Sequence, residues 1–228
     1  MSGPLPKALS FDAAGTLIEL SEPVGVSYST VAIRHQILAE PEAISTAFKT
    51  VWRRTPSAFS AESPVRDPNE KSWWRRLVRD VFEEAGTELG REIDFDSFFE
   101  DLYDHFESPG TWVAVPEAAS LVTALTEHYR CIVLSNFDGR LRRILADLDL
   151  LAPFETVLLS CELGASKPDP KVFEAARSHF GLEPSHILHI GDAPVCDWNG
   201  AQDAGFQSFR VGEGQSTLRE LFEQLSLA

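Results

Sequence analysis

Acidic, hydroxyl and basic side chains follow short apolar runs at four places in the sequence. Such runs are typical of strands buried on both faces of a parallel sheet. Ligands of an open α/β sheet bind beside the carboxyl ends of its strands, where the strand order reverses. We therefore expect the polar residues after these runs to meet at one edge of a sheet. In chain order they are Asp12, Ser135, Asn136, Lys167, Asp192 and Asp197.

The types and spacing of these residues suit an anion and a hard cation. Asp12 precedes a glycine turn, whose backbone N–H groups can cradle an anion. Ser135 offers a hydroxyl with N–H groups behind it, and Lys167 offers a positive charge in a loop stiffened by two prolines. Asp192 and Asp197 supply the carboxylate oxygens that Mg²⁺ prefers.

Each segment also has an ordinary structural explanation. Asp and Gly are common turn residues, and a serine after a strand is a good N-cap for the next helix. A lysine in a loop is often solvated, and a pair of aspartates can cap a helix. The chemistry is therefore inferred from the four segments together.

The elements expected to position these residues alternate between strand and helix. Apolar runs predict strands at 8–12, 131–135, 156–160, 187–191 and 207–211. Helical periodicity predicts helices at 117–128, 139–149, 170–180 and 199–204. This alternation indicates βαβ units, and hence an α/β fold with a Rossmann-like, doubly wound parallel sheet.

The segment between the first strand and Trp112 has a different pattern. Its apolar residues repeat with helical spacing, and no convincing strand is apparent. Helices are predicted at 24–38, 41–53, 72–85 and 95–106. We therefore expect two domains: an α/β core of residues 1–17 and 113–228, and an inserted α-helical cap of residues 18–112.

Composition limits the kinds of molecule that the protein is expected to bind and indicates where in the cell it is found. The formal net charge of −15 argues against a general nucleic-acid binder and against attraction to anionic membranes. Three separated cysteines, and the absence of a secretory signal or a long apolar run, favour a cytoplasmic protein. These features do not fix the oligomeric state.

Together the four segments resemble the haloacid dehalogenase superfamily. The family order is Asp-x-Asp-x-Thr, then Ser or Thr, then Lys, then Gly-Asp-x-x-x-x-Asp. The matches here, in the order of the chain, are Asp12 with Thr16, Ser135, Lys167, and Gly191-Asp192 with Asp197. The resemblance implies a helical cap over a Rossmann-like core.

The resemblance also implies a mechanism and a set of roles. Asp12 would attack phosphorus and form an aspartyl-phosphate, which water would hydrolyse. Lys167 would act with it in catalysis, and Ser135, Asn136 and Lys167 would hold the phosphoryl oxygens. Mg²⁺ would be held by Asp12, the Ala14 carbonyl and Asp192, with Asp197 supporting the ion or its waters. The expected substrate is a small phosphorylated metabolite.

Ala14 departs from the family pattern, which usually has a second aspartate there. That aspartate protonates the leaving group and later activates water, whereas its backbone carbonyl is the metal ligand. An alanine leaves the magnesium site intact and removes a general acid/base, typically worth about 10²–10⁴ in rate. We therefore expect a slowed Mg²⁺-dependent phosphatase.

Other interpretations of Ala14 stay open. A side chain of the cap could replace the acid, with candidates His35, His105, Glu19 and Asp67. The fold could serve instead as a binding or regulatory module with weak activity or none.

The resemblance brings two further chemistries into consideration. Phosphonoacetaldehyde hydrolases share Asp-x-Ala-Gly-Thr but need a cap lysine, for which only Lys49 and Lys71 are available. Haloacid dehalogenases carry a tyrosine at the Ala14 position and a Ser-Asn pair near the fourth motif. The Gly191-Asp192 pair therefore argues against C–halogen hydrolysis.

A closer resemblance is to a subgroup found in animals and bacteria whose members also replace the second aspartate. It rests on Ala14, on the 131–138 segment and on the cap pair Trp73-Trp74. We expect that tryptophan pair to pack within the cap, because aromatic side chains contribute mainly through buried area.

Overall fold

The computed structural model describes residues 4–59, 70–87, 89–90 and 92–226. The chain folds into two compact units. The α/β unit consists of Met1–Glu19 and Val113–Ala228, and the helical unit consists of Leu20–Trp112. The helical unit is thus an insertion in the sequence of the α/β unit, and each unit is described by itself below.

A five-stranded parallel sheet forms the centre of the α/β unit, which confirms the predicted fold class. The strand order is β5-β4-β1-β6-β7. The chain builds the sheet outward from β1 on one side and then returns to β1's other side. The order therefore reverses between β1 and β6, where ligands of such sheets bind. The strands are β1 (Ala8–Phe11), β4 (Arg130–Ser135), β5 (Val157–Leu159), β6 (Ile187–Gly191) and β7 (Gln207–Arg210).

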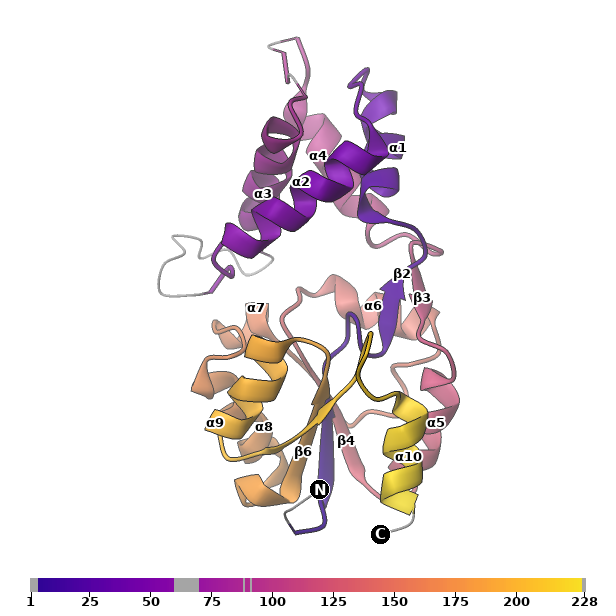
Figure 1. The fold of residues 1–228 in the computed structure, drawn as a ribbon, viewed down its shortest axis with the longest axis vertical. Helices are drawn as coiled ribbons and strands as arrows, with labels where there is room; N and C mark the ends of the chain where they lie inside the picture. Colours follow the sequence, from indigo (N-terminus) through magenta and orange to yellow (C-terminus); the bar gives the residue numbers. More distant parts are fainter. Residues whose placement is uncertain (1–3, 60–69, 88, 91, 227–228) are drawn as a thin grey trace. The chain divides into compact units, whose positions relative to one another are not determined.

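Helices cover both faces of this sheet, as its apolar strands require. Figure 1 shows α8 and α9 on one side of the strands and α5 and α10 on the other. Phe173 and Ala176 of α8 pack with Ile132 and Ile187 of the sheet in a buried apolar cluster. The helices of the unit are α5 (Ala118–Thr126), α6 (Arg140–Asp147), α7 (Ser160–Leu163), α8 (Pro170–Phe180), α9 (Gly200–Asp203) and α10 (Leu218–Ser226), with a 3₁₀ turn η1 (Pro184–His186) and a π-helical turn η2 (Pro194–Asn199).

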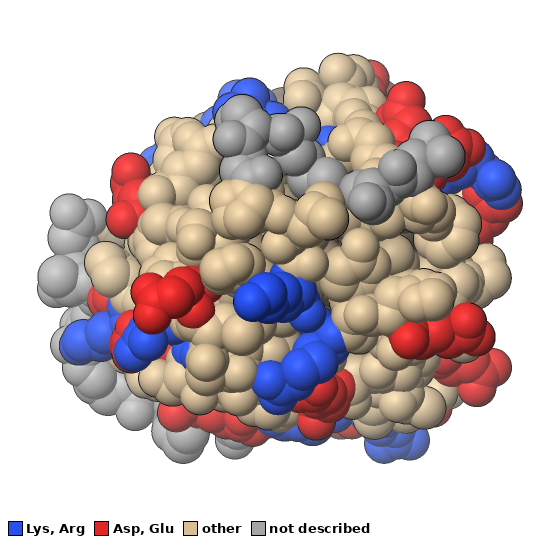
Figure 2. Space-filling model, turned by 90° about the horizontal axis from the view of Figure 1, so that it is seen from below, with Lys and Arg blue, Asp and Glu red and all other residues tan. Residues whose placement is uncertain are grey.

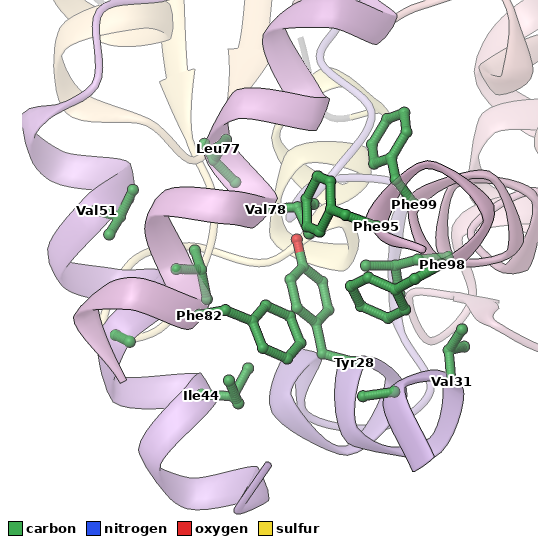
Figure 3. Close-up of a cluster of buried hydrophobic side chains, with 14 of the residues drawn as sticks. Tyr28, Val31, Ile44, Val51, Leu77, Val78, Phe82, Phe95, Phe98 and Phe99 are labelled. Carbon is green, nitrogen blue, oxygen red and sulfur yellow. The ribbon is translucent and has the colours of Figure 1, made fainter. Parts of the chain in front are cut away.

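The helical unit has a hydrophobic core of its own. Figure 3 shows this core, where the rings of Tyr28 and Phe82 stack with their centroids 6.1 Å apart. Trp73 is buried, and its Nε1 donates to the Pro56 carbonyl over 2.9 Å, so it packs within the unit. The helices are α1 (Val24–Arg34), α2 (Pro41–Arg54), α3 (Lys71–Glu84) and α4 (Phe95–His105).

Two strands lie where no convincing strand was predicted. β2 (Ile18–Leu20) and β3 (Trp112–Ala114) pair in a two-stranded sheet near the points where the chain leaves and rejoins the α/β unit. Each is three residues long, which is too short for apolar alternation to be recognised. The prediction of an all-helical segment is therefore wrong at both of its ends.

Other differences are in helix boundaries and short elements. The predicted helix 24–38 ends at Arg34, before Gln36, which adopts a positive φ of 61°. The predicted helix 199–204 is continuous with the π-helical turn before it. α7 and α10 were not predicted. α7 is only one turn long, and α10 follows the last strand that was expected from the sequence.

Figure 2 shows one face of the molecule, on which basic side chains gather beside acidic ones. One such pair in the α/β unit is Arg130, at the start of β4, which makes two hydrogen bonds of 2.8 Å to Glu155. Among the described helices, none is both long and apolar enough to cross a membrane.

Candidate active site

The ends of three adjacent strands bring the predicted aspartates and serine together. Asp12 follows β1, Ser135 ends β4 and Asp192 follows β6. The N–H of Asp12 donates to the Ile190 carbonyl of β6 over 2.8 Å, which fixes the exit of β1. Ser135 Oγ donates to Asp12 Oδ1 over 3.1 Å. The three residues therefore lie at the point where the strand order reverses.

Lys167 joins this group from the loop before α8. Its ammonium lies 2.7 Å from Asp12 Oδ1 and 2.6 Å from Asp197 Oδ1. Lys167 is 2% exposed, so the solvated position considered for it from sequence is wrong. A buried ammonium requires partners of opposite charge, and the two carboxylates supply them.

Asp197 is held by more donors than any other carboxylate described in the site. Its Oδ1 accepts from Lys167 and from His189 Nε2, the latter over 3.1 Å. Its Oδ2 accepts from the Ala193 backbone N–H over 2.9 Å, inside the turn that leads into η2. A Cβ on Gly191 would lie 2.4 Å from the Asp197 Cγ, so this approach requires glycine at the end of β6.

Asp192 completes an acidic cluster. One oxygen each from Asp12, Asp192 and Asp197 can be chosen so that all three lie within 4.8 Å of one another. Asp192 is half-buried, and it packs against Gly15 so closely that a Cβ there would lie 2.4 Å from Asp192 Oδ2. Three convergent carboxylates form an oxygen-only donor set, which suits a hard divalent cation.

Asn136 has a structural task that sequence reasoning did not foresee. Its Nδ2 donates to the Lys167 carbonyl over 2.9 Å, and its Oδ1 accepts from the Lys167 N–H over 2.7 Å. The amide side chain therefore holds the main chain of Lys167. Its Nδ2 also lies 4.0 Å from Cys196 Sγ, so both ends of the amide make contacts within the protein.

A polar pair lies behind the site: His189 is expected from its place in the strand to be a core residue beside the site, but its pairing with Ser10 was not predicted. Ser10 lies in β1, two residues before Asp12, and its Oγ is 2.8 Å from His189 Nδ1. Both residues are fully buried. The only sequence signal is a serine and a histidine inside apolar runs, and neither residue indicates a partner by itself.

Burial and charge shift the acidities of the site in opposite directions. Burial raises the pKa of Asp12 to about 6, and nearby carboxylates add to this while Lys167 opposes it. Burial also raises the pKa of Asp192. For Asp197 the cost of burial is outweighed by Lys167 and His189, which lower its pKa. Burial alone would lower the pKa of Lys167, but Asp12 and Asp197 raise it, so its ammonium stays charged.

Ala14 is half-buried and contributes no titratable group to this arrangement. The neighbouring Thr16 is buried, and its Oγ1 has no hydrogen-bond partner among the described residues. The acidic cluster and Lys167 thus come together without a second aspartate in the β1 turn.

The substitutes considered for the missing acid are mostly in the other unit. His35 pairs with Asp101 over 2.8 Å, and His105 is half-buried with its Nε2 unpaired among the described residues. Glu19 is exposed in the α/β unit, and Asp67 lies outside the described residues.

The two lysines considered for Schiff-base chemistry also belong to the helical unit. Lys71 forms an ion pair with Glu100 and lies 4.8 Å from the centroid of the Tyr103 ring. Lys49 is exposed on α2. Neither shows the desolvated surroundings that activate a lysine as a nucleophile.

Comparison with known proteins decides the family. A model of the haloacid dehalogenase-like hydrolases matches residues 6–205, which include every site residue described above. The chain belongs to the haloacid dehalogenase-like hydrolase family. It is 33% identical over 206 residues to human haloacid dehalogenase-like hydrolase domain-containing protein 3, covering 90% of this chain and 81% of the human protein. The chain is accordingly a hydrolase of this family.

Solved structures of the family share the fold at low identity. A putative haloacid dehalogenase-type hydrolase from Bacillus subtilis, bound to magnesium, superposes with a TM-score of 0.77 at 19% identity, covering 98% of this chain and all of that chain. A phosphatase of the family from Thermococcus onnurineus gives 0.63 at 20% identity, covering 96% and 97%. An L-2-haloacid dehalogenase from Xanthobacter autotrophicus gives 0.70 at 22% identity, covering 91% and 78%. The fold therefore accommodates both chemistries.

Proposed function

We propose that this hydrolase is a Mg²⁺-dependent phosphatase that acts through a phosphoryl group carried on Asp12. The observation that carries the proposal is the pairing of a buried Asp12 with Lys167 and Ser135, beside a second carboxylate, Asp192. Such a site combines a carboxylate nucleophile with the positive charge and donors that a phosphoryl group requires.

The acidic cluster fits a magnesium ion. Asp197 already accepts hydrogen bonds from Lys167, His189 and Ala193, whereas Asp12 Oδ2 accepts none from the described residues. We therefore assign Asp12, Asp192 and the Ala14 carbonyl as the ligands, with Asp197 in support. When bound, the ion would neutralise charge on the phosphoryl oxygens. A structure of related fold from B. subtilis is bound to magnesium, which supports the choice of this ion.

The chain's own groups supply the remaining chemistry. Lys167 has three ammonium hydrogens and uses two of them on Asp12 and Asp197, so one is left for a phosphoryl oxygen. The Asn136 backbone N–H, directly after β4, would hold another oxygen, and so would the Ser135 hydroxyl once it turns its single hydrogen from Asp12 Oδ1 to the phosphoryl group. Because Lys167 is buried and fixed through its backbone, its charge needs little reorganisation during the reaction.

The reaction proceeds in two displacements at phosphorus. An Asp12 carboxylate oxygen bonds to phosphorus while the bond to the leaving oxygen breaks, and the leaving group departs with that electron pair. A water oxygen then bonds to phosphorus and the bond to Asp12 breaks. Inorganic phosphate forms, the water proton passes to solvent, and the Asp12 carboxylate is regenerated.

Ala14 determines which substrates this site can use. No side chain in the β1 turn can protonate a departing alkoxide, because Ala14 occupies the position two residues after Asp12. We therefore propose a small metabolite whose leaving group departs as a stable anion, such as an acyl phosphate. The second displacement lacks a positioned base, so turnover should be slow.

The alanine also supports one alternative, a metal-dependent binding module with little or no turnover. In that case the acidic cluster and Lys167 would retain a phosphorylated ligand without releasing phosphate. Hydrolysis of a carbon–halogen bond, as in the dehalogenase of related fold, is less well supported, because Asp192 belongs to an acidic cluster that suits a cation.

Phosphate release from acetyl phosphate and p-nitrophenyl phosphate, measured with Mg²⁺, tests the proposal. We expect release by the native protein that is abolished in Asp12→Asn. Ala14→Asp should accelerate release from both substrates by about 10² or more, because it restores a general base for the second displacement. If neither substrate gives Asp12-dependent release, even in Ala14→Asp, the phosphatase proposal fails and the binding module is favoured.

A further inference from the structure

A row of polar side chains runs through the core of the α/β unit to the candidate site. Ser10 of β1 and His189 of β6 are in register and fully buried, with Ser10 Oγ 2.8 Å from His189 Nδ1. The other ring nitrogen of His189 lies 3.1 Å from Asp197 Oδ1. Asp197 Oδ1 in turn lies 2.6 Å from the Lys167 ammonium, which contacts Asp12.

The hydrogen bonds of this row determine which ring nitrogen of His189 carries a proton. Asp197 is ionised beside Lys167, so its oxygen can only accept, and His189 Nε2 must donate to it. In the neutral ring Nδ1 is then an acceptor, which takes the hydroxyl hydrogen of Ser10. The ring is also fixed by Phe173, which meets it edge-on at 5.6 Å between centroids.

We propose that Ser10 and His189 are positioning residues for Lys167. Ser10 fixes the tautomer and orientation of His189, His189 fixes Asp197 Oδ1, and Asp197 holds the Lys167 ammonium against Asp12. An effect of these residues on turnover rests on the proposed phosphatase function, whereas their effect on the position of the Lys167 ammonium does not.

Core packing alone gives no reason for this row. Apolar side chains of similar size would fill the space between β1 and β6 without the cost of burying polar groups. The row instead supplies one of the two side-chain donors to Asp197 Oδ1, and the other is Lys167 itself. Without His189, Asp197 would be held by the Ala193 N–H at Oδ2, and its Oδ1 would keep Lys167 as its one side-chain donor. Groups that orient the ligands of a metal ion are typically worth about 10–100-fold in metal affinity or activity, and we expect an effect at the lower end of this range here.

Three substitutions separate positioning from packing. His189→Met removes both hydrogen bonds and keeps a large apolar side chain. His189→Gln can place its amide N–H where Nε2 lies, so it can restore the bond to Asp197. Ile187→Ala is the matched control, because Ile187 is a buried residue two positions earlier on the same strand and belongs to the apolar cluster. Ser10→Ala tests the start of the row if His189 variants do not fold.

The first readout needs no turnover. Nitrogen-15 NMR of the native, metal-free protein should show His189 protonated at Nε2 and unprotonated at Nδ1. The Lys167 ammonium resonance should move in His189→Met, return toward the native position in His189→Gln, and stay in place in Ile187→Ala. Ser10→Ala should let the Nδ1-protonated tautomer of His189 appear. A native ring protonated only at Nδ1, or a Lys167 signal unmoved in His189→Met, would overturn the proposal.

The second readout is turnover of acetyl phosphate. We expect kcat to fall about tenfold in His189→Met, to recover in His189→Gln, and to stay near the native value in Ile187→Ala. Equal losses in His189→Met and Ile187→Ala would mean a packing role and contradict the proposal. If the native protein releases no phosphate, the phosphatase function fails, and the Lys167 resonance still decides whether the row positions the lysine.

Discussion

At Gly15 the backbone has a φ of +84°, and a Cβ there would lie 2.4 Å from Asp192 Oδ2. We therefore expect Gly15→Ala to displace Asp192 and to weaken Mg²⁺ binding by at least tenfold. The matched control is Gly214→Ala, because Gly214 has a φ of +70° but no atom within 4 Å of its Cβ position. Both variants should lose about 1–2 kcal/mol of stability from backbone strain.

Isothermal titration with Mg²⁺ and thermal unfolding with and without Mg²⁺ separate these effects. Stabilisation by a bound ion follows its affinity for the folded state. Gly214→Ala should keep the Mg²⁺-dependent rise in Tm, and Gly15→Ala should lose most of it. Equal Mg²⁺ affinities in the two variants would show that a side chain at position 15 does not displace Asp192 from the ion, and would contradict this prediction.

The acidity of Asp12 predicts how Mg²⁺ binding depends on pH. Burial raises its pKa to about 6 in the metal-free fold, from a usual 3.8. Above pH 6 the buried, ionised carboxylate therefore lowers the free energy of unfolding. Protonation in the folded state removes this penalty as the pH falls from 6 toward 3.8. A cation requires the ionised form, so Mg²⁺ must displace a proton below pH 6, and its affinity should fall there.

Calorimetric titration between about pH 7.5 and about pH 5, in buffers of different ionisation enthalpy, measures both the affinity and the protons released. Proton release should grow as the pH falls through about 6. Asp12→Asn should bind Mg²⁺ more weakly and with less pH dependence. An affinity for the native protein that stays constant over this interval would rule out Asp12 as a ligand with a raised pKa.

Among the helices and strands, the start of α8 supports the Lys167 loop. Asp169 caps this helix by accepting from the Lys171 N–H over 2.9 Å, and Pro170 occupies its first position. Asp169→Ala should lower the free energy of unfolding by about 1 kcal/mol, because it removes this cap. Asp169→Asn keeps an acceptor and should be close to native in urea denaturation. A loss in Asp169→Asn equal to that in Asp169→Ala would assign the effect to charge.

Elements with clear sequence signals were predicted well. β6 and α8 have the predicted bounds, because a short apolar run defines one, and Pro170 and Gly181 mark the ends of the other. β2 and β3 carry no such signal, since three residues cannot show a period. Helical periodicity likewise does not predict the π-helical turn before α9. This turn carries Asp197, which pairs with Lys167.

In the molecule as a whole, one sheet edge gathers residues from 12 to 197, although a separate helical unit interrupts the chain. Strand order explains why Asp12, Ser135 and Asp192 meet, and this much follows from the sequence. Three features of the site do not follow from the sequence: the burial of Lys167, the bonds that the Asn136 side chain makes to the Lys167 main chain, and the Ser10–His189 pair. They depend on which side chains face one another once the strands are in register, and one sequence does not contain that information.

A covalent bond between phosphorus and Asp12 is the step on which the proposed function depends, and a quench experiment with radiolabelled acetyl phosphate detects it. The acetate leaving group needs no acid, while water attack lacks a base at Ala14, so the phosphorylated protein should accumulate. We predict up to one label per chain, mapped to Asp12, with less accumulation in Ala14→Asp and none in Asp12→Asn. Turnover of acetyl phosphate with no label at Asp12, or label that persists in Asp12→Asn, would contradict this mechanism.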